Sequence, residues 1–584
     1  MEKYSVDVLD KQVGSVAIEL FGPTFKFRPN QKESIVTTLY NWLNDIKDDI
    51  IISAPTGSGK SIIALLCGAV LSKYYKMKGY ILCSDLGLLD QYKNDIEKCF
   101  CNWSVLKGRK EYTCFKNGLD FNAGYCQLKG VTSYKEILRV FPECKTECPY
   151  IVARNKAMVS DVLVCTYAFW LIQQNIVAKT AENPPFDKRD FVICDEAHKL
   201  VNIVQDHFSP VFDVNDMKKI KTIIESANPE NSDVIEELEA SREKIMLYND
   251  VNDIAYELKK YVSNLSIVND AVDTIHRCID VDNLSKEDKS LLYYGQYISE
   301  QYSIFEDYLG VVNSVGATVI VKNPNTDEPK NIKFNCINES YLMNRFFHDN
   351  CKKKMYMSAT IGSPVSYANN HAISSYEYIS IPSTFKFDNS PIFYVPDYRL
   401  SYKEKEYSLP KIIDMVTSIV RMYKGRKGII QTGSYKFSKD LYENVPKDVK
   451  SRLLLYNDSA EKGESIDFFK YSSDDKILVG PSLIEGLNFN DDYCRFQIIM
   501  KVPYPSLSDK FISRKKDINQ KWYSDETAIS ILQGVGRGIR HENDWCVTFI
   551  LDGCFSYLAK SSSDMFPDEF KNRIQVINSN VFIK

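Results

Sequence analysis

The residues from Ala54 to Ser61 have the types and spacing of a phosphate-binding loop. They read Ala-Pro-Thr-Gly-Ser-Gly-Lys-Ser and fit G-x-x-x-x-G-K-[ST], except that Ala54 replaces the first glycine. In such a loop Gly57 and Gly59 lie among backbone N–H groups that cradle phosphates. Lys60 can reach the β- and γ-phosphates, and the Ser61 hydroxyl can ligate Mg²⁺. We therefore expect a nucleotide with Mg²⁺ here.

An acidic tetrapeptide, Asp195-Glu196-Ala197-His198, follows the apolar run 191–194. A carboxylate at a strand end beside a phosphate loop suits Mg²⁺, directly or through water, and Asp195 is the candidate. Glu196 is placed to position and activate the attacking water. We expect His198 to couple this site to a second domain. The alternative is a chance acidic start of a helix.

Two further elements carry hydroxyl and guanidinium groups. Ser358-Ala359-Thr360 follows the apolar run 355–357 and places two hydroxyls at a strand end. In the run 533–540, Arg537 and Arg540 are three positions apart and share a face if the run is helical. Two guanidinium groups there can act as arginine fingers that stabilise the γ-phosphate in the transition state. The alternative is a solvated, basic start of a helix.

Apolar runs that alternate with helical patterns predict the scaffold for these groups. The run 50–53 reads as a buried strand before the loop, and 61–70 reads as a helix after it. Runs at 79–83, 162–165 and 191–194 read as further strands of a parallel sheet. Residues 205–305 look helical and polar, and a strand pattern returns at 317–321. A second α/β block, with strands at 428–431 and 476–479, starts near residue 385.

Size and composition indicate a multidomain globular protein. At 584 residues the chain should hold about three to four domains. Its 44% hydrophobic and 26% charged residues are ordinary for globular proteins. No apolar run approaches the roughly 18 residues of a membrane span, and the N-terminus lacks a signal-peptide pattern. We expect a cytoplasmic protein, or a nuclear one in a eukaryotic or viral setting. The richness in Lys, Ile, Asn and Tyr suggests an AT-rich genome, such as that of a phage or virus.

The chain has sixteen cysteines, and a group of them lies in the segment between the phosphate loop and the acidic tetrapeptide: Cys114, Cys126, Cys144 and Cys148. In a reducing compartment, clustered cysteines suggest a metal before a disulfide. Structural zinc sites usually contain two close cysteine pairs, and only Cys144 and Cys148 are close here. Zinc and unliganded core cysteines nevertheless remain alternatives at this point.

The surrounding segment is locally basic, although the whole chain carries a net charge of −4. Residues 101–154 contain nine Lys or Arg and five Asp or Glu. Aromatic residues are interleaved with them, a composition that suits a phosphate track with stacking rings. The alternative is a solvated face around a metal module. The rings are Tyr112, Phe115, Phe121, Tyr125 and Tyr134.

The order of these motifs resembles that of superfamily 2 helicases of the XPD/DinG branch. Ser-x-x-Glu-Gly-x-Asn-Phe at 482–489 and Gln-x-x-Gly-Arg-x-x-Arg at 533–540 carry most of this resemblance. Phe-Arg-Pro-Asn-Gln at 27–31 resembles the family's adenine-reading element. The resemblance covers nearly the whole chain and is weakest over residues 205–340.

The resemblance implies an α/β fold with two RecA-like parallel-sheet motor domains and the nucleotide, ATP, at their interface. It implies an ATP-hydrolysing DNA helicase that moves on single-stranded DNA in the 5′→3′ direction. Gln31 would read adenine, and Gly486 would belong to the nucleotide site. Gln533 would join Glu196 and the two arginines in the catalytic set.

The resemblance also assigns the cysteines. XPD-like helicases hold a [4Fe–4S] cluster in the corresponding interval, and four thiolates are what such a cluster needs. The sequence from Lys107 to Cys114 looks like the family's opening Gly-Arg-x-x-x-x-Cys, and Cys148-Pro-Tyr looks like its closing element. The resemblance therefore implies a cluster bound by Cys114, Cys126, Cys144 and Cys148.

The expected domain boundaries follow from these motifs. The first motor domain would comprise residues 1–98, 154–204 and 306–384, interrupted by an iron–sulfur domain at 99–153 and a helical Arch-like domain at 205–305. The second motor domain would comprise residues 385–584.

We expect single-stranded, fork or R-loop DNA as the partner, no membrane association and a monomer. One alternative function is a single-strand translocase or R-loop remodeller that unwinds duplexes poorly. Another is a nucleic-acid-binding subunit with an idle motor, which the intact Lys60, Asp195 and Glu196 argue against.

Overall fold

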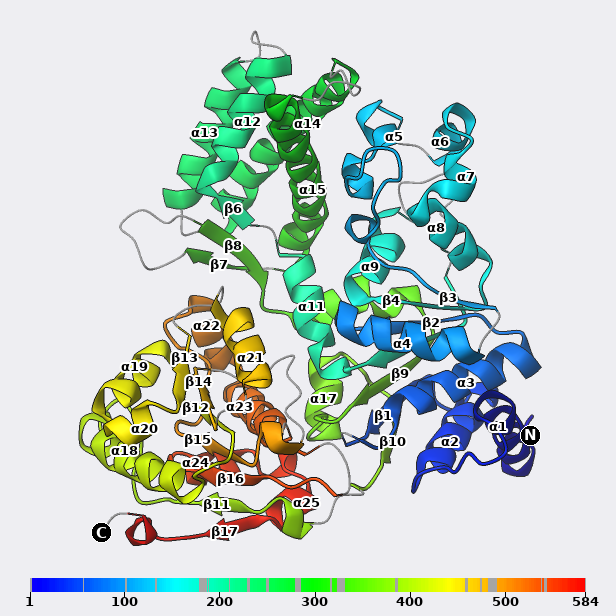
Figure 1. Cartoon of the computed structure of the whole chain (residues 1–584). Helices are drawn as coiled ribbons and strands as arrows, with labels where there is room; N and C mark the ends of the chain where they lie inside the picture. Colours follow the sequence, from blue (N-terminus) through cyan, green and yellow to red (C-terminus); the bar gives the residue numbers. More distant parts are fainter. Residues whose placement is uncertain are drawn as a thin grey trace.

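The computed structural model describes the chain from residue 3 to residue 582 apart from several short segments. These segments are 56, 100–101, 132–133, 178–185, 187, 210, 228–231, 248–250, 279–284, 316–317, 323–330, 384–386, 457–460, 473–474, 482–490, 537 and 540–542. Two seven-stranded parallel sheets, one in each half of the chain, form the body of the molecule (Figure 1). Among the described helices, none is both long and apolar enough to cross a bilayer.

The first sheet confirms the predicted parallel arrangement. Its spatial order is β10-β1-β9-β5-β2-β4-β3, and every neighbouring pair is parallel. Its strands are β1 (Asp49–Ser53), β2 (Gly79–Cys83), β3 (Trp103–Val105), β4 (Val162–Thr166), β5 (Phe191–Asp195), β9 (Lys353–Ser358) and β10 (Tyr376–Ser380). Its helices are α1 (Val6–Phe21), α2 (Gln31–Leu43), α3 (Lys60–Tyr75), α4 (Leu86–Cys99), α9 (Tyr167–Ile172), α11 (Leu200–His207) and α17 (Pro364–Asn370).

Alternate residues of these strands enter two different hydrophobic cores. Ile50 and Ile52 pack into the core that contains α1, α2 and α3, whereas Ile51 packs into the core that contains α9 and α11. Side chains alternate between the two faces of a strand, so a run of consecutive apolar residues requires a sheet covered on both faces. This explains why β1, β2, β4 and β5 read as continuous apolar runs.

The cysteine-rich segment forms a small module of short helices between β3 and β4. The module consists of two 3₁₀ turns at Arg109–Glu111 and Phe121–Ala123 and of α5 (Tyr125–Leu128), α6 (Tyr134–Val140), α7 (Cys144–Glu147) and α8 (Pro149–Val159). Its apolar side chains join the same continuous core as α9 and α11. The module is therefore packed directly onto the first motor.

A second insertion, between β5 and β9, combines long helices with a small antiparallel sheet. The helices are α12 (Val214–Ala227), α13 (Ser232–Leu247), α14 (Val251–Cys278), α15 (Lys286–Val315) and α16 (Glu339–Phe346). The strands, in the order β6-β8-β7, are β6 (Val211–Asp213), β7 (Thr318–Lys322) and β8 (Asn331–Cys336). Figure 1 shows the insertion above the two motor sheets.

The position of β7 corrects one expected boundary. The last part of the first motor was expected to span residues 306–384, with the strand pattern at 317–321 inside it, but residue 306 lies inside α15. Both β7 and β8 pair within the three-stranded sheet rather than with the motor sheet. Periodicity predicts a strand but not its partner, so the insertion extends at least to β8. The short β6 at the start of the insertion had no detectable signal.

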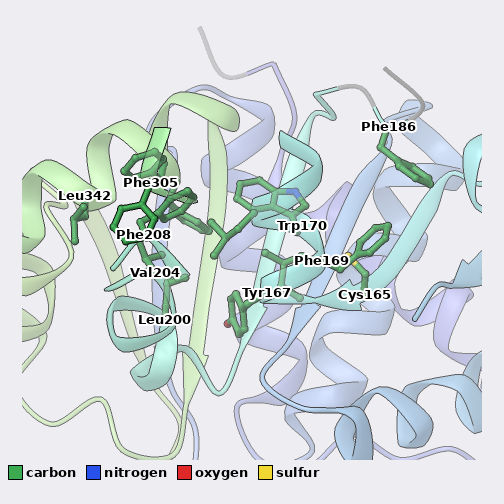
Figure 2. Packing of buried hydrophobic residues seen from close by; sticks show 14 of the residues in the cluster. Cys165, Tyr167, Phe169, Trp170, Phe186, Leu200, Val204, Phe208, Phe305 and Leu342 are labelled. Carbon is green, nitrogen blue, oxygen red and sulfur yellow. The ribbon is translucent and has the colours of Figure 1, made fainter. Parts of the chain in front are cut away.

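Aromatic side chains pack the second insertion against the first motor. Phe208, which follows α11, stacks on Phe346 of α16 with ring centroids 3.6 Å apart. Figure 2 shows Phe208 and Phe305 on the insertion side of this core and Trp170 of α9 on the motor side. Trp170 in turn packs against Phe347 at 5.2 Å. Both ends of the insertion therefore rest on one buried aromatic cluster.

The second motor has the sheet order β13-β14-β12-β15-β16-β11-β17, again parallel throughout. Its strands are β11 (Ile392–Tyr394), β12 (Gly428–Gln431), β13 (Leu453–Leu455), β14 (Ile477–Gly480), β15 (Phe496–Ile499), β16 (Val547–Ile550) and β17 (Ile574–Val576). Its helices are α18 (Lys405–Met422), α19 (Tyr435–Asn444), α20 (Lys447–Lys450), α21 (Glu461–Tyr471), α22 (Lys510–Ile518), α23 (Gln520–Val535), α24 (Phe555–Ser561) and α25 (Asp568–Lys571).

We predict that Gly79→Ala destabilises the first motor. Gly79 is the partner of Phe191 across β2 and β5, and a Cβ at residue 79 would come within 2.1 Å of that ring. Overpacking of a core typically costs about 1–3 kcal/mol. Thermal or denaturant unfolding measures the loss. Gly463→Ala is the control, because a Cβ there meets no atom within 4 Å. A loss of stability no larger than in this control would contradict the packing argument.

Candidate active site

The phosphate loop joins β1 to α3 in a conformation that depends on glycine. Gly57 and Gly59 have φ angles of 81° and 83°, in the left-handed region that favours glycine. Gly59 precedes the first turn of α3, which begins at Lys60. The loop therefore leads directly into the N-terminus of α3, and the N-terminus of a helix attracts anions.

Two polar groups of the loop fit a phosphate ligand. Ser58 Oγ is buried and has no hydrogen-bond partner among the described residues. Lys60 Nζ lies 3.6 Å from Glu196 Oε1, so an ammonium and a carboxylate face each other at the mouth of the loop. Buried polar atoms normally have partners. An incoming phosphate with its metal would provide partners for this set of groups.

Gln31 is held against the phosphate loop. Its Oε1 accepts a hydrogen bond from Arg28 N at 3.1 Å, and its Nε2 donates to Gly59 O at 3.2 Å. The residue is buried, and a Cβ on Gly59 would come within 2.4 Å of its amide nitrogen. Adenine reading by Gln31 stays a prediction. The hydrogen bonds of Gln31 connect the start of α2 to the phosphate loop.

Asp195 and Glu196 stand at the carboxyl end of β5, opposite Lys60. Asp195 Oδ1 accepts a hydrogen bond from Glu196 N at 2.9 Å. Burial and the neighbouring Glu196 carboxylate raise the pKa of Asp195 to about 6, while Lys60 opposes the shift. Glu196 adopts a left-handed backbone conformation with φ of 52°. Its two carboxylate oxygens face Lys60 and His198, respectively.

A chain of polar contacts runs from this carboxylate to the second motor. His198 Nδ1 is 3.4 Å from Glu196 Oε2 and 2.8 Å from Ser358 Oγ. Ser358 Oγ accepts from Thr360 N at 3.0 Å, and Gln533 Nε2 of α23 donates to Thr360 Oγ1 at 3.4 Å. A change at the nucleotide site therefore has a continuous polar route from one motor to the other.

The site opens into a cleft of about 1100 Å³ between the two motors. Glu196, His198 and Thr360 line it from the first motor, and Gln533 and Gly536 line it from the second. Three residues predicted for this site, Gly486, Arg537 and Arg540, lie outside the described residues. Their assignments stay predictions.

Three residues that donate hydrogen bonds to Ser61 or Asp195 belong to none of the motifs recognised in the sequence. Gln91 Nε2 of α4 donates to Ser61 Oγ at 3.4 Å, and Tyr92 Oη donates to Asp195 Oδ2 at 2.8 Å. Tyr167 Oη of α9 donates to the main-chain oxygen of Asp195 at 2.9 Å. Each is an ordinary helical residue in the sequence, and no spacing rule relates it to a partner 28 to 103 positions away.

The four cysteines predicted to bind a metal are all buried in the module between β3 and β4. Cys114 lies at the start of a tight loop in which Gly118 N donates to its carbonyl at 2.9 Å. Cys148 precedes α8, and the nearby N–H groups of Tyr150 and Ile151 oppose the rise in the pKa of its thiol that burial causes. Tyr125 N donates to Cys114 Sγ at 3.4 Å. A backbone N–H group thus points at the sulfur of Cys114.

The thiols interact electrostatically with one another. Burial raises the pKa of Cys126 and Cys148, with a further contribution from the Cys114 thiol in both cases. Burial together with Cys126 and Cys148 raises the pKa of Cys144 to about 12. Four thiolates in this space need a compensating positive charge, and a metal centre would supply it. Among the described residues, no three His, Cys, Asp or Glu side chains converge on a single ion.

Most of the aromatic rings in the module are structural. Phe121 is buried, and Tyr112, Tyr125 and Tyr134 are partly buried. Cations of the module cover three of these rings: Arg109 lies 5.8 Å from Phe121, Lys116 4.9 Å from Tyr125 and Arg154 3.9 Å from Tyr134. Phe115 is the most exposed of the five predicted rings, with 37% of its surface accessible. Phe121 is buried and therefore does not face a bound strand, whereas stacking by the other four rings stays a prediction.

Two protein-family models match separate parts of the chain. Residues 24–231 match the family described as type III restriction enzyme, res subunit, and residues 418–573 match the helicase C-terminal domain family. The chain is 22% identical to the ATP-dependent DNA helicase XPD of Sulfolobus acidocaldarius, over 89% of this chain and 97% of that protein. It is also 22% identical to the ATP-dependent DNA helicase YoaA of Escherichia coli, over 70% and 66% of the two chains.

Solved structures of XPD proteins share the fold. An XPD helicase structure superposes with a TM-score of 0.59 at 17% identity, covering 95% of this chain and all of that one. The Xpd4 structure from S. tokodaii superposes with a TM-score of 0.57 at 15% identity, covering 94% and 99%. The resemblance therefore extends across both motors and both insertions.

We predict that Mg²⁺-dependent nucleotide binding weakens as the pH falls through about 6. The raised pKa of Asp195 means that its carboxyl group becomes protonated in this range and loses its charge for the cation. Because the metal and the proton compete for one carboxylate, added Mg²⁺ should move the midpoint to lower pH. Titration with a fluorescent ATP analogue measures the profile. The Asp195→Asn protein should bind weakly without this pH step, and a step that persists in it would contradict the assignment.

Proposed function

Because this chain belongs to the XPD/DinG-like family of superfamily 2 helicases, we propose that it hydrolyses ATP to translocate on DNA and separate its strands. One observation carries the proposal. Lys60, Glu196 and Ser358 meet at the edge of the first sheet, and Gln533 reaches this group from the second motor. An ATPase site connected to the second motor is what a nucleotide-driven motor requires.

The residues of the first motor have distinct roles in hydrolysis. Lys60 neutralises the β- and γ-phosphates and leaves its contact with Glu196 when they bind. Glu196, released from that ion pair and still beside His198, orients and deprotonates the attacking water. Ser61 and Asp195 would hold Mg²⁺, which supplies charge neutralisation at the phosphates. Gln31 holds the phosphate loop through its hydrogen bond to Gly59 O, and it recognises the adenine base.

The second motor completes the site. Gln533 is on the last turn of α23, and Arg537 and Arg540 follow this helix in the sequence. We assign the two arginines to the γ-phosphate as fingers that act when the cleft closes. Gly486 belongs to the same nucleotide-facing set. Hydrolysis then changes the Thr360–Gln533 contact, and through it the relative positions of the motors.

The proposed substrate is single-stranded DNA at a fork or an R-loop, with movement in the 5′→3′ direction. The names of the relatives and the local excess of positive charge over residues 101–154 support DNA as the partner. We propose that the protein acts as a monomer where this DNA is found, in the cytoplasm or in a nucleus.

We propose that Cys114, Cys126, Cys144 and Cys148 hold a [4Fe–4S] cluster. A [4Fe–4S] cluster takes four thiolate ligands, and these four thiols are buried together and influence one another's pKa. The N–H group of Tyr125 that donates to Cys114 would stabilise its thiolate, and the N–H groups of Tyr150 and Ile151 act to lower the pKa of Cys148. The cluster would fasten a small module that has little core of its own.

We predict that Lys60→Ala and Glu196→Gln both abolish ATP hydrolysis but differ in binding. Loss of the ammonium should weaken ATP binding, whereas Glu196→Gln should leave it largely intact because only water activation is removed. Phosphate release and fluorescent-nucleotide binding are the two measurements. The exposed pair Lys439 and Glu443 offers a control, since Lys439→Ala should leave both readings unchanged. Normal turnover in either site variant would remove the assignment.

The same assays separate the proposed helicase from its alternatives. Hydrolysis that DNA stimulates excludes an idle motor. Strand separation on a forked duplex excludes a translocase that unwinds poorly.

We predict that Cys→Ser at residues 114, 126, 144 or 148 removes the cluster and abolishes unwinding, while some ATPase activity remains. The motor residues lie on other elements, so they should still form their site. Iron content and the visible spectrum of anaerobically purified protein, with fork unwinding, test this. Cys67→Ser is the control, because Cys67 is buried in the other core of the first motor. Zinc without iron in the wild type would overturn the cluster, and full unwinding by Cys114→Ser would overturn its role.

A further inference from the structure

One helix touches both side chains that the proposed mechanism gives to Mg²⁺. On α4, Gln91 Nε2 donates to Ser61 Oγ at 3.4 Å, and the next residue, Tyr92, donates from Oη to Asp195 Oδ2 at 2.8 Å. The Tyr92 hydroxyl also has the Ser61 side chain as a hydrogen-bonding neighbour. Ser61 and Asp195 come from different loops, so Tyr92 stands at the point where the two predicted ligands meet.

The contact fixes the direction of the Asp195 carboxylate. Oδ1 accepts from Glu196 N, and Oδ2 accepts from Tyr92. With one donor on each oxygen, rotation of the carboxylate breaks at least one hydrogen bond. Each carboxylate oxygen keeps a second lone pair. Those remaining lone pairs are the ones that can face a cation or a water molecule bound to it.

Tyr92 itself has little freedom. Its side chain is fully buried, and Leu89 and Ile96 on the same helix are buried with it. Asp90 pairs with Lys107 at 2.7 Å, which ties α4 to the segment that leads into the cysteine module. A tyrosine hydroxyl is protonated near neutral pH, since its ordinary pKa is about 10, so Tyr92 remains a donor. A rigid donor can orient a carboxylate better than a mobile one.

We propose that Tyr92 is a positioning residue for the divalent cation, which orients Asp195 and connects it to Ser61. This role rests on the ATPase activity proposed above and adds a residue that the helicase motifs do not contain. Partners that orient metal ligands typically contribute 10–100-fold to metal affinity or activity. Removal of the hydroxyl should therefore weaken cation binding while the protein remains folded.

A matched control exists in the same site. Tyr167 is buried like Tyr92 and donates to the main-chain oxygen of Asp195 at 2.9 Å. Tyr167→Phe removes a buried hydroxyl bonded to the same residue but leaves the carboxylate contact intact. A purely structural role of Tyr92 predicts similar behaviour of the two Phe variants. A positioning role predicts that only Tyr92→Phe changes cation binding.

The test measures the affinity for Mn²⁺ by electron paramagnetic resonance of the free ion, with the full-length protein and a non-hydrolysable ATP analogue. We expect Tyr92→Phe to raise the half-saturating Mn²⁺ concentration about 10-fold and Tyr167→Phe to leave it unchanged. In steady-state hydrolysis, Tyr92→Phe should require more Mg²⁺, and saturating Mg²⁺ should restore most of the turnover. Thermal unfolding should show comparable losses of stability for both variants.

Equal Mn²⁺ affinity in Tyr92→Phe and the wild type would overturn the proposal, as would an equal loss in both Phe variants. If Tyr92→Phe does not fold, Tyr92→Met removes the same hydroxyl and carries the same comparison. A wild-type protein that binds Mn²⁺ and the nucleotide but hydrolyses no ATP would overturn the proposed function instead. The two failures are therefore distinguishable.

Discussion

The parallel register of β1, β9 and β5 is the constraint on which the rest of the site depends. These three strands are neighbours, and their pairing sets Ser53 level with Ser358 and Asp195 level with Met357. Parallel strands end at the same edge of a sheet, so the loops that follow these three strands all lie along that edge. The phosphate loop, the acidic tetrapeptide and the Ser-Ala-Thr element therefore meet, although they come from positions about 300 residues apart. A slip of one residue would turn each of these groups to the opposite face.

The acidic residues at this edge of the sheet lie next to basic side chains. Glu196 faces both Lys60 and His198, and Asp195 is buried with a pKa raised to about 6. Lys60 compensates the Glu196 carboxylate, and polar contacts continue from Glu196 through His198, Ser358 and Thr360 to Gln533. A nucleotide with its metal would add further cationic partners for the two carboxylates.

The two insertions leave the first sheet uninterrupted, because each begins and ends within a connection between two of its strands. The cysteine module lies between β3 and β4, and the helical insertion lies between β5 and β9. Both pack into one continuous hydrophobic core with α9 and α11. The insertion also touches the second motor, since Lys515 of α22 pairs with Glu339 of α16 and both are nearly buried. This ion pair joins the second motor to the base of the insertion.

The sequence by itself determined the groups that act through local geometry. The glycines of the phosphate loop, the strands at 50–53 and 191–194 and the carboxylates after the second of these strands follow from periodicity and spacing, which extend over a few residues. Only the tertiary structure decided which distant groups meet: Tyr92 with Asp195, Gln533 with Thr360 and β6 with β8. It also placed Phe121 in the core of the cysteine module, where composition had suggested stacking on bases. The physical reason is that backbone preferences are set by near neighbours, whereas burial and hydrogen bonding across 100 or more positions depend on how whole elements pack.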